Sequence, residues 1–304
     1  MPNNPLKSLV FVTGKGGTGK STVAAALGLA AARQGRRTLI AETHDRSDVL
    51  AILGARRGAV HEEQCVGGQL HHVSIDSDAV LAEYITDQLP GPIATVVRRS
   101  RAFSTLAAAT PGLRELLTIG KIWEMAQPER RLPGGEPYDT VIVDAPATGH
   151  GMAMLSSPQT FAEAARGGPV MRQASMIGET IADPDQTTIL AVARPEELPV
   201  SETIELAGSL TEAFPDQQLQ RVIVNRVVPK HFSAADLELL RAAEPVAGAP
   251  VHAALSQADR RAAQQRQISR LRRALRGDTA LRTLPELAEI NDDALLTIAK
   301  AVLR

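Results

Sequence analysis

The sequence predicts an α/β fold with a mainly parallel sheet and helices on both of its faces. Short apolar segments alternate with helical patterns along the chain, and most of these segments are continuously apolar, as strands covered on both faces are. The first apolar segment, 9–13, is followed by an Ala-rich helical pattern at 21–33 and a second apolar segment at 38–41. Strand, helix and strand at this spacing form a βαβ unit, which requires a parallel sheet.

The remaining elements continue this pattern over a single domain, residues 1–304. Further strands are expected at 72–75, 140–143, 188–192 and 221–224. Residues 79–127 and 151–181 contain helical patterns without a strand, so we expect them to be helical elaborations of the domain. Residues 256–304 are expected to form C-terminal helices, of which the first is rich in arginine.

Composition excludes several classes of protein. Lys plus Arg is 33 and Asp plus Glu is 34, so the formal net charge is −1, and we expect no nucleic-acid partner. The single cysteine, Cys65, can form neither a disulfide within the chain nor a metal site of paired cysteines. Residues 1–7 lack the order of a signal peptide, and no apolar run reaches the roughly 18 residues of a membrane span. These features favour a cytoplasmic enzyme or carrier.

A phosphate-binding loop follows the first strand. The pattern G-x-x-x-x-G-K-[ST] is formed by Gly14, Lys15, Gly16, Gly17, Thr18, Gly19, Lys20 and Ser21. Glycines let backbone N–H groups turn towards phosphate oxygens, and the following helix N-terminus adds positive potential. We therefore expect ATP and Mg²⁺ here, with Lys20 on the β- and γ-phosphates, Ser21 on the metal and Thr22 on the α-phosphate.

An acidic residue ends the strand expected at 140–143. Asp144 comes directly after this strand and could hold Mg²⁺ through water beside the loop. Residues 145–150 continue with Pro, Thr and Gly, which is typical of a mobile turn. Gly149 is expected to offer its N–H group to the γ-phosphate, so that the segment moves on hydrolysis.

Five blocks of the sequence resemble the arsenite-pump (ArsA) ATPases and the Get-pathway ATPase that targets tail-anchored proteins. They are the K-G-G-x-G-K-[ST] loop beginning at Lys15, residues 70–84, the DAPATGH segment at 144–150, residues 195–203, and Asn225 at the end of a strand. The resemblance covers about residues 8–230 and is strongest to the ArsA-like ATPases of actinobacteria. It implies a P-loop NTPase of the deviant Walker A (SIMIBI) class.

The resemblance also implies roles for individual residues. In these families the lysine at the position of Lys15 crosses a dimer interface to the partner's nucleotide, which implies a homodimer or a heterodimer with a paralogue. Asn225 would hold the adenine base. No Asp follows it in the N-K-x-D pattern of GTP-binding proteins, so ATP is favoured over GTP.

The chain departs from the family at the first switch. His44 stands where the family has the Asp that orients the attacking water, and Asp45 stands where it has a Pro. A neutral His44 or a shifted Asp45 could position that water, and we expect hydrolysis to be slow or absent. With one cysteine, the chain lacks both the thiolates of the arsenite site and the C-x-x-C of the Get-type zinc site.

Two functions follow from these features. The first is a dimeric ATPase switch that couples nucleotide state to a hydrophobic client or membrane protein, for which four of the six methionines, between Met152 and Met176, are candidate contacts or core residues. The alternative is a peripheral ATP-binding subunit of a membrane transport or export system, catalytically weak and paired with a paralogue. The Arg-rich helix is either its membrane contact or a solvated face.

Overall fold

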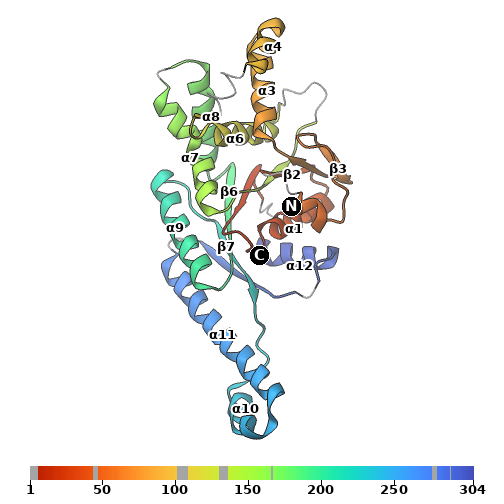
Figure 1. Ribbon diagram of the computed structural model, residues 1–304, viewed down its shortest axis with the longest axis vertical. Coiled ribbons are helices and arrows are strands. Elements are labelled where there is room, and N and C mark those ends of the chain that lie inside the picture. The colour runs from red at the N-terminus through yellow and green to blue at the C-terminus, as the bar shows by residue number, and fades with distance from the viewer. Residues whose placement is uncertain are drawn as a thin grey trace.

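The structure is a computed structural model that describes residues 6–43, 47–100, 109–129, 136–165, 167–275, 279–287 and 289–304. Its centre is an eight-stranded sheet with the order β3-β4-β2-β5-β1-β6-β7-β8 (Figure 1). β3 pairs antiparallel with β4, and all the other neighbouring strands are parallel. The strands are β1 Leu9–Thr13, β2 Thr38–Glu42, β3 Gln64–Gly67, β4 Leu70–Ser74, β5 Thr140–Asp144, β6 Thr187–Ala193, β7 Arg221–Val227 and β8 Ala280–Pro285.

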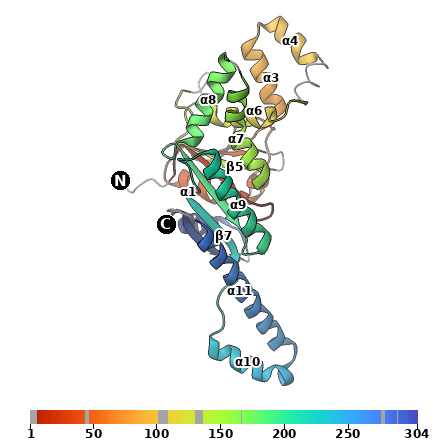
Figure 2. The same ribbon diagram turned by 90° about the vertical axis from the view of Figure 1, so that its left-hand side faces the viewer.

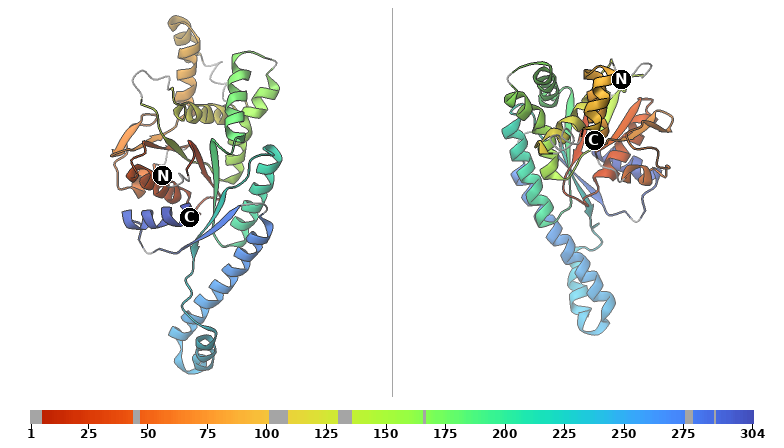
Figure 3. Two further views of the ribbon diagram at one scale, coloured as in Figure 1. Left: turned by 180° about the vertical axis from the view of Figure 1, so that it is seen from behind. Right: turned by 45° about the horizontal axis from the view of Figure 1, so that its top comes forward.

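Helices cover both faces of the sheet. Leu9 and Phe11 of β1 belong to a buried cluster that includes side chains of α6, α7, α8, α9 and α11. Val10 and Val12 belong to a second cluster with α1, α2 and α12, and α12 packs beside α1 (Figure 3). The bounds are α1 Lys20–Arg33, α2 Asp48–Ile52, α6 Leu113–Met125, α7 Thr148–Ala164, α8 Pro169–Ala182, α9 Glu197–Ala213, α11 Ala249–Ala274 and α12 Asp292–Leu303. Continuous burial of the central strands follows from this two-sided cover.

Two helical regions extend beyond the sheet at opposite ends of the molecule (Figures 1 and 2). At one end α3, Ser77–Gln88, and α4, Gly91–Arg99, stand beyond α6 and α8. At the other end α10, Ala234–Ala247, folds back against the first half of the long helix α11. Among the described residues, no helix is both long and apolar enough to cross a membrane.

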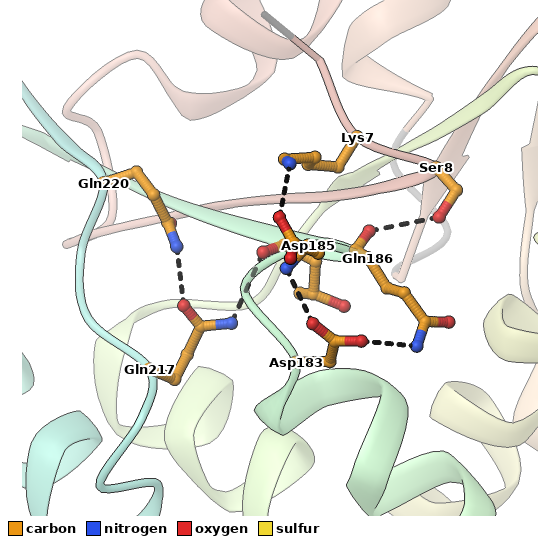
Figure 4. Close-up of polar contacts among 8 residues, drawn as sticks. Lys7, Ser8, Asp183, Asp185, Gln186, Gln217 and Gln220 are labelled. Carbon is orange, nitrogen blue, oxygen red and sulfur yellow. Dashed lines mark hydrogen bonds and ion pairs between the residues drawn. The ribbon is translucent and has the colours of Figure 1, made fainter.

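A polar network ties the amino ends of β1 and β6 together, away from the phosphate loop (Figure 4). Lys7 pairs with Asp185 at 3.1 Å, and the Ser8 hydroxyl donates to the Gln186 carbonyl at 3.1 Å. The buried Gln217 amide donates to the Ile181 carbonyl at 2.9 Å. The Ser8 and Gln217 bonds satisfy backbone carbonyl groups just before β6 and at the end of α8.

The α/β class, the parallel sheet and each of the strands predicted from apolar segments are confirmed, with ends within three residues. β3, β8 and α10 were not predicted. β3 and β8 are short edge strands with partly exposed, polar residues such as Arg282, so they lack the apolar signal of a central strand. β8 also lies inside the C-terminal stretch that was expected to be helical, and it precedes α12.

Candidate nucleotide site

The glycine-rich loop between β1 and α1 has a backbone that side chains would not tolerate. Gly14 has a φ of 139°, and a Cβ atom there would lie 2.1 Å from the Val192 carbonyl oxygen of β6. Gly19 has a φ of 102°, and a Cβ atom there would lie 2.4 Å from the amide nitrogen of Asn225. Gly17 also has a positive φ, 78°. The loop therefore lies directly against β6 and β7, and Gly14 and Gly19 are required by both conformation and space, whereas Gly17 is favoured by conformation alone.

The first backbone N–H groups of α1 follow this loop directly and have no acceptor within the helix. The first intrahelical bond runs from the Val23 N–H group to the Gly19 carbonyl at 3.0 Å. The N–H groups of Lys20, Ser21 and Thr22 precede it, so they have no acceptor one turn earlier in the helix and are suited to an anion. Thr18 turns inward, and its hydroxyl donates to the Lys15 carbonyl at 2.8 Å.

Lys20 is partly buried beside Asp144. Its ammonium donates to the Lys15 carbonyl at 3.4 Å. Burial lowers the pKa of Lys20 below its usual value, and the negative charge of Asp144 counters part of that shift. A cation held in a desolvated position next to free helix N–H groups has a strong electrostatic attraction for phosphate.

Asp144 ends β5 at the same edge of the sheet. It is the register partner of Val12 on β1 and of Glu42 on β2, and it is 0% exposed. Thr43 donates its hydroxyl to the Asp144 carbonyl at 3.0 Å, which joins the ends of β2 and β5. The buried Asp144 carboxylate and the hydroxyl of Ser21, in the first turn of α1, are the kind of hard oxygen ligands that Mg²⁺ prefers, so the chemistry of these residues fits the expected metal.

The segment after Asp144 leads into α7. The hydroxyl of Thr148, the first residue of α7, donates to Glu202 Oε2 on α9 at 2.8 Å. Gly149 and His150 are exposed in the first helical turn, where N–H groups have no intrahelical acceptor. Together with Lys15, Gly16 and Glu205 they line a cavity of about 530 Å³ beside the loop. Gly149, the predicted γ-phosphate contact, therefore lines the same cavity as Lys15 and Gly16 of the phosphate loop.

Lys15 and Asn225 have partners within the chain. The Lys15 ammonium forms a short ion pair with Glu202 Oε1. The Asn225 amide donates to the Thr18 carbonyl at 2.9 Å and accepts from the Arg226 N–H group at 2.9 Å, so it secures the loop from β7. Asn225 was expected to hold the adenine base, and its contact with the phosphate loop is a structural one that the sequence did not reveal.

The first-switch residues His44 and Asp45 lie outside the described residues. Two residues before His44 in the sequence, Glu42 forms a buried pair with His72 that sequence reasoning missed, with 2.5 Å between Glu42 Oε2 and His72 Nε2. Glu42 Oε1 also accepts from the Val49 N–H group at the start of α2, at 3.2 Å. The available signal was a glutamate and a histidine within two strands otherwise predicted to be buried. Within the described residues no cluster of three or more His, Cys, Asp or Glu could hold a metal, and Cys65 is exposed.

An apolar cavity of about 420 Å³ lies between α3, α6, α7 and α8. Its lining includes Leu81, Tyr84, Val97, Leu113, Leu116, Leu117, Phe161, Val170 and Ile177. Lys121 also lines it, pairing with Glu83 at 2.9 Å and with Glu124 at 3.5 Å. This size and lining are typical of a pocket for an apolar ligand or side chains.

The methionines do not line this cavity in the described part of the chain. Met154 is in the core, Met152 lines the cavity beside the loop, and Met176 is 51% exposed. The apolar surface that could take a client is formed by aliphatic and aromatic residues instead.

Comparison with known proteins identifies the family. The profile of the anion-transporting ATPase (ArsA) family matches residues 7–167 and 168–246. ATPase BagA of Mycobacterium tuberculosis (strain H37Rv) is 36% identical over 236 residues, which span 75% of this chain and 68% of the relative. ATPase GET3 of Kluyveromyces lactis is 25% identical over 262 residues, which span 75% of this chain and 74% of the relative.

A putative arsenical pump-driving ATPase of Halobacterium salinarum is 27% identical over 234 residues, which span 73% of this chain and 36% of the relative. The profile match takes in the glycine-rich loop, Asp144, Thr148 and Glu202. With the parallel sheet and the loop geometry described above, these matches establish that the chain is an ATPase of the ArsA family.

Proposed function

We propose that this ATPase is a nucleotide-driven switch that binds ATP with Mg²⁺ at the loop of residues 14–22. Lys20 would pair with the β- and γ-phosphates, and the first-turn N–H groups of α1 would bind the phosphate oxygens. Ser21 and Asp144 would hold Mg²⁺, whose charge offsets that of the phosphates. Gly149 would sense the γ-phosphate through its N–H group, and Asn225 at the end of β7 would lie beside the base.

The switch acts as a dimer with a second copy or a paralogue. Lys15 is the basis of this proposal, because its resemblance to the deviant Walker A lysine implies contact with a partner's nucleotide. The half-open cavity beside Lys15 supports the idea, since Gly16, Gly149 and His150 leave this face of the loop accessible. Specific residues of the partner do not enter the proposal.

Coupling to an apolar client rests on a single helix. α7 begins at Thr148, next to the phosphate loop, and its residue Phe161 lines the apolar cavity. The two positions are 13 residues apart, or about 20 Å along a helix at ~1.5 Å per residue. A shift of the first turn of α7 towards a γ-phosphate would therefore reach one wall of the cavity through this helix, in which Pro158 lies between the two positions and permits a bend.

A fluorescent helical peptide of about 20 Leu and Ala residues, flanked by lysines, tests this function. We expect its affinity to differ at least fivefold between protein with a non-hydrolysable ATP analogue and protein with ADP, in line with a typical coupling of ~1–3 kcal/mol. Val170→Asp, at an exposed position of the cavity wall, should abolish binding. Leu239→Asp is the matched control, since Leu239 is 71% exposed on α10. Equal peptide affinity in both nucleotide states would contradict the proposal.

One observation favours the alternative of a peripheral membrane subunit. Arg266, Arg272 and Arg273 surround a shallow depression of about 530 Å³ on α11, with Gln265 and Ser269 between them. Such a basic surface could bind anionic headgroups at about 1 kcal/mol per arginine near the membrane. Co-sedimentation of the protein with phosphatidylglycerol vesicles would support this alternative. The fraction of protein that sediments should fall with added salt and in the double variant Arg266→Gln/Arg273→Gln. Equal sedimentation with neutral phosphatidylcholine vesicles would contradict it.

A further inference from the structure

Glu202 joins two motif segments that are far apart in the sequence. Its Oε1 atom pairs with the Lys15 ammonium of the phosphate loop, and its Oε2 atom accepts from the Thr148 hydroxyl at 2.8 Å. The side chains of Lys15 and Glu202 are 33% and 23% exposed, so the pair is in partial contact with water. One carboxylate therefore contacts the loop lysine and the start of the second switch at the same time.

These contacts keep Glu202 ionised. The hydrogen bond from Lys15 lowers the pKa of Glu202, and the bond from Thr148 adds to this, whereas burial acts in the opposite direction. Charge-assisted hydrogen bonds of this type are about twice as strong as neutral ones. The Lys15 ammonium is thus held against α9 and away from the centre of the loop.

When a nucleotide is bound, two anions compete for the Lys15 ammonium. A phosphate oxygen of a nucleotide is the natural competitor of the Glu202 carboxylate for the ammonium. Movement of Thr148 removes one of the two hydrogen bonds that fix the Glu202 carboxylate, which weakens its hold on Lys15. Glu205 lies about one turn further along α9 and lines the same cavity, but among the described residues it is Glu202, and not Glu205, that pairs with Lys15.

We propose that Glu202 is a positioning residue for the ATPase reaction, which retains Lys15 in the nucleotide-free chain and releases it to a phosphate when Thr148 moves. The inference deepens the proposed function and rests on it, because Lys15 is assigned a contact with nucleotide there. Release of the lysine is then linked to the γ-phosphate sensor, so Lys15 becomes available only when the second switch has responded. The same carboxylate would set how much ATP is needed for assembly.

The first test measures the Lys15–Glu202 contact without nucleotide. The rate at which acetic anhydride acetylates each lysine is followed by mass spectrometry. Glu202→Gln should raise the Lys15 rate about three- to tenfold, because an amine that donates to a carboxylate is protected from acylation, and should leave the Lys7 rate unchanged. Glu205→Gln is the matched control and should change neither. An unchanged Lys15 rate in Glu202→Gln would overturn the proposal.

The second test measures the ATP analogue concentration that gives half-maximal dimerisation, by light scattering. Glu202→Gln should lower this concentration about two- to fivefold, as expected for the loss of a partly exposed ion pair worth ~0.5–1 kcal/mol. Thr148→Val, which removes only the hydroxyl contact, should change it in the same direction by less. Lys15→Met alone should raise this concentration, because it removes the contact with the partner's nucleotide. In that background, at analogue concentrations that still give dimers, Glu202→Gln should cause no further shift, since the two residues act through one contact.

The two tests separate the proposals. If the wild-type chain never dimerises with the analogue, alone or with a paralogue, the proposed function is wrong, and the acetylation result still decides whether Glu202 holds Lys15. If the wild type dimerises but Glu202→Gln has the same effect with and without Lys15, Glu202 has a merely structural role and the inference is wrong.

Discussion

Glu42 and Asp144 are register partners at the carboxyl ends of β2 and β5, and both side chains are 0% exposed. Adjacent buried carboxylates need separate compensation, because like charges at this spacing repel strongly in a low dielectric. Glu42 has it from His72 and from the Val49 N–H group, whereas Asp144 lies near the Lys20 ammonium. The edge of the sheet at the site is therefore built from two carboxylates with different partners.

Removing the imidazole partner of Glu42 should destabilise the protein strongly. We expect His72→Leu to lower the free energy of unfolding by about 3–5 kcal/mol, because it leaves a buried carboxylate without its partner. Glu42→Gln in the same background should recover part of the loss. Urea denaturation measures both, with His252→Leu as the control at a 78% exposed side chain. A loss below ~1 kcal/mol would show that the pair is not compensated in this way.

Two glycines of the loop, Gly14 and Gly16, should differ in their tolerance of a methyl group. Gly14→Ala should lower the free energy of unfolding by about 2 kcal/mol or more, because the new Cβ would meet the Val192 carbonyl at 2.1 Å in a positive-φ conformation. Gly16→Ala should stay within ~0.5 kcal/mol, since no atom lies within 4 Å of a Cβ built there. Thermal unfolding of both variants provides the comparison, and equal losses would contradict the loop geometry.

The ion pair beside the apolar cavity predicts a pH dependence. Burial raises the pKa of Glu83, but the hydrogen bond and charge of Lys121, helped by His61, lower it overall below the ordinary 4.5. A carboxyl with a lowered pKa stabilises the fold above the unfolded-state value, and that contribution is lost as pH falls through the folded-state value.

Glu83→Gln should therefore lower the free energy of unfolding by about 0.5–1 kcal/mol at pH 7, since the carboxylate is half exposed, and by a decreasing amount at acidic pH as the folded-state carboxyl takes up a proton. Asp185→Asn is the control, because Asp185 is 90% exposed in its pair with Lys7 and should have little effect at pH 7. Urea titrations at pH 7 and at acidic pH give the result. A difference between Glu83→Gln and wild type that persists at low pH would rule out this ion pair as its cause.

Hydrolysis should be slow, well below the ~10 s⁻¹ of a median enzyme, because His44 stands where the family has a water-orienting Asp. We expect Asp45→Asn to remove the residual phosphate release while ATP binding survives, and His44→Ala to matter less. The reverse order, with a rate that falls as imidazole protonates, would assign the role to His44. Turnover of the wild type at tens per second would contradict the prediction.

The central fold and the loop could be predicted because their physical signals are local. Continuous apolar segments identify buried parallel strands, and the glycine pattern at 14–19 needs only the strand before it and the helix after it. β3 and β8 could not be predicted in this way, since their residues are partly exposed and owe their strand conformation to the neighbours β4 and β7.

Residues that act through long-range contacts were the hardest to predict. Glu202 is part of a recognisable segment at 195–203, but its contacts with Lys15 and Thr148 join positions that are 187 and 54 residues away. In the sequence, Lys121 and Glu83 likewise resemble ordinary helical charges. Their pairing depends on the packing of α3 against α6. Periodicity reports which face of a helix is apolar, and it does not report which charges meet across the fold.

Binding of a fluorescent ATP analogue in the presence of Mg²⁺ tests the central claim most directly. The wild type should bind it saturably, and Lys20→Ala should weaken binding at least a hundredfold, or ~2.7 kcal/mol, because it removes the cation assigned to the β- and γ-phosphates. Lys7→Ala, at the opposite end of β1, should bind as the wild type does. Near-normal affinity in Lys20→Ala would contradict the assignment of the loop as the phosphate-binding site, and it would also contradict the proposed nucleotide-driven switch.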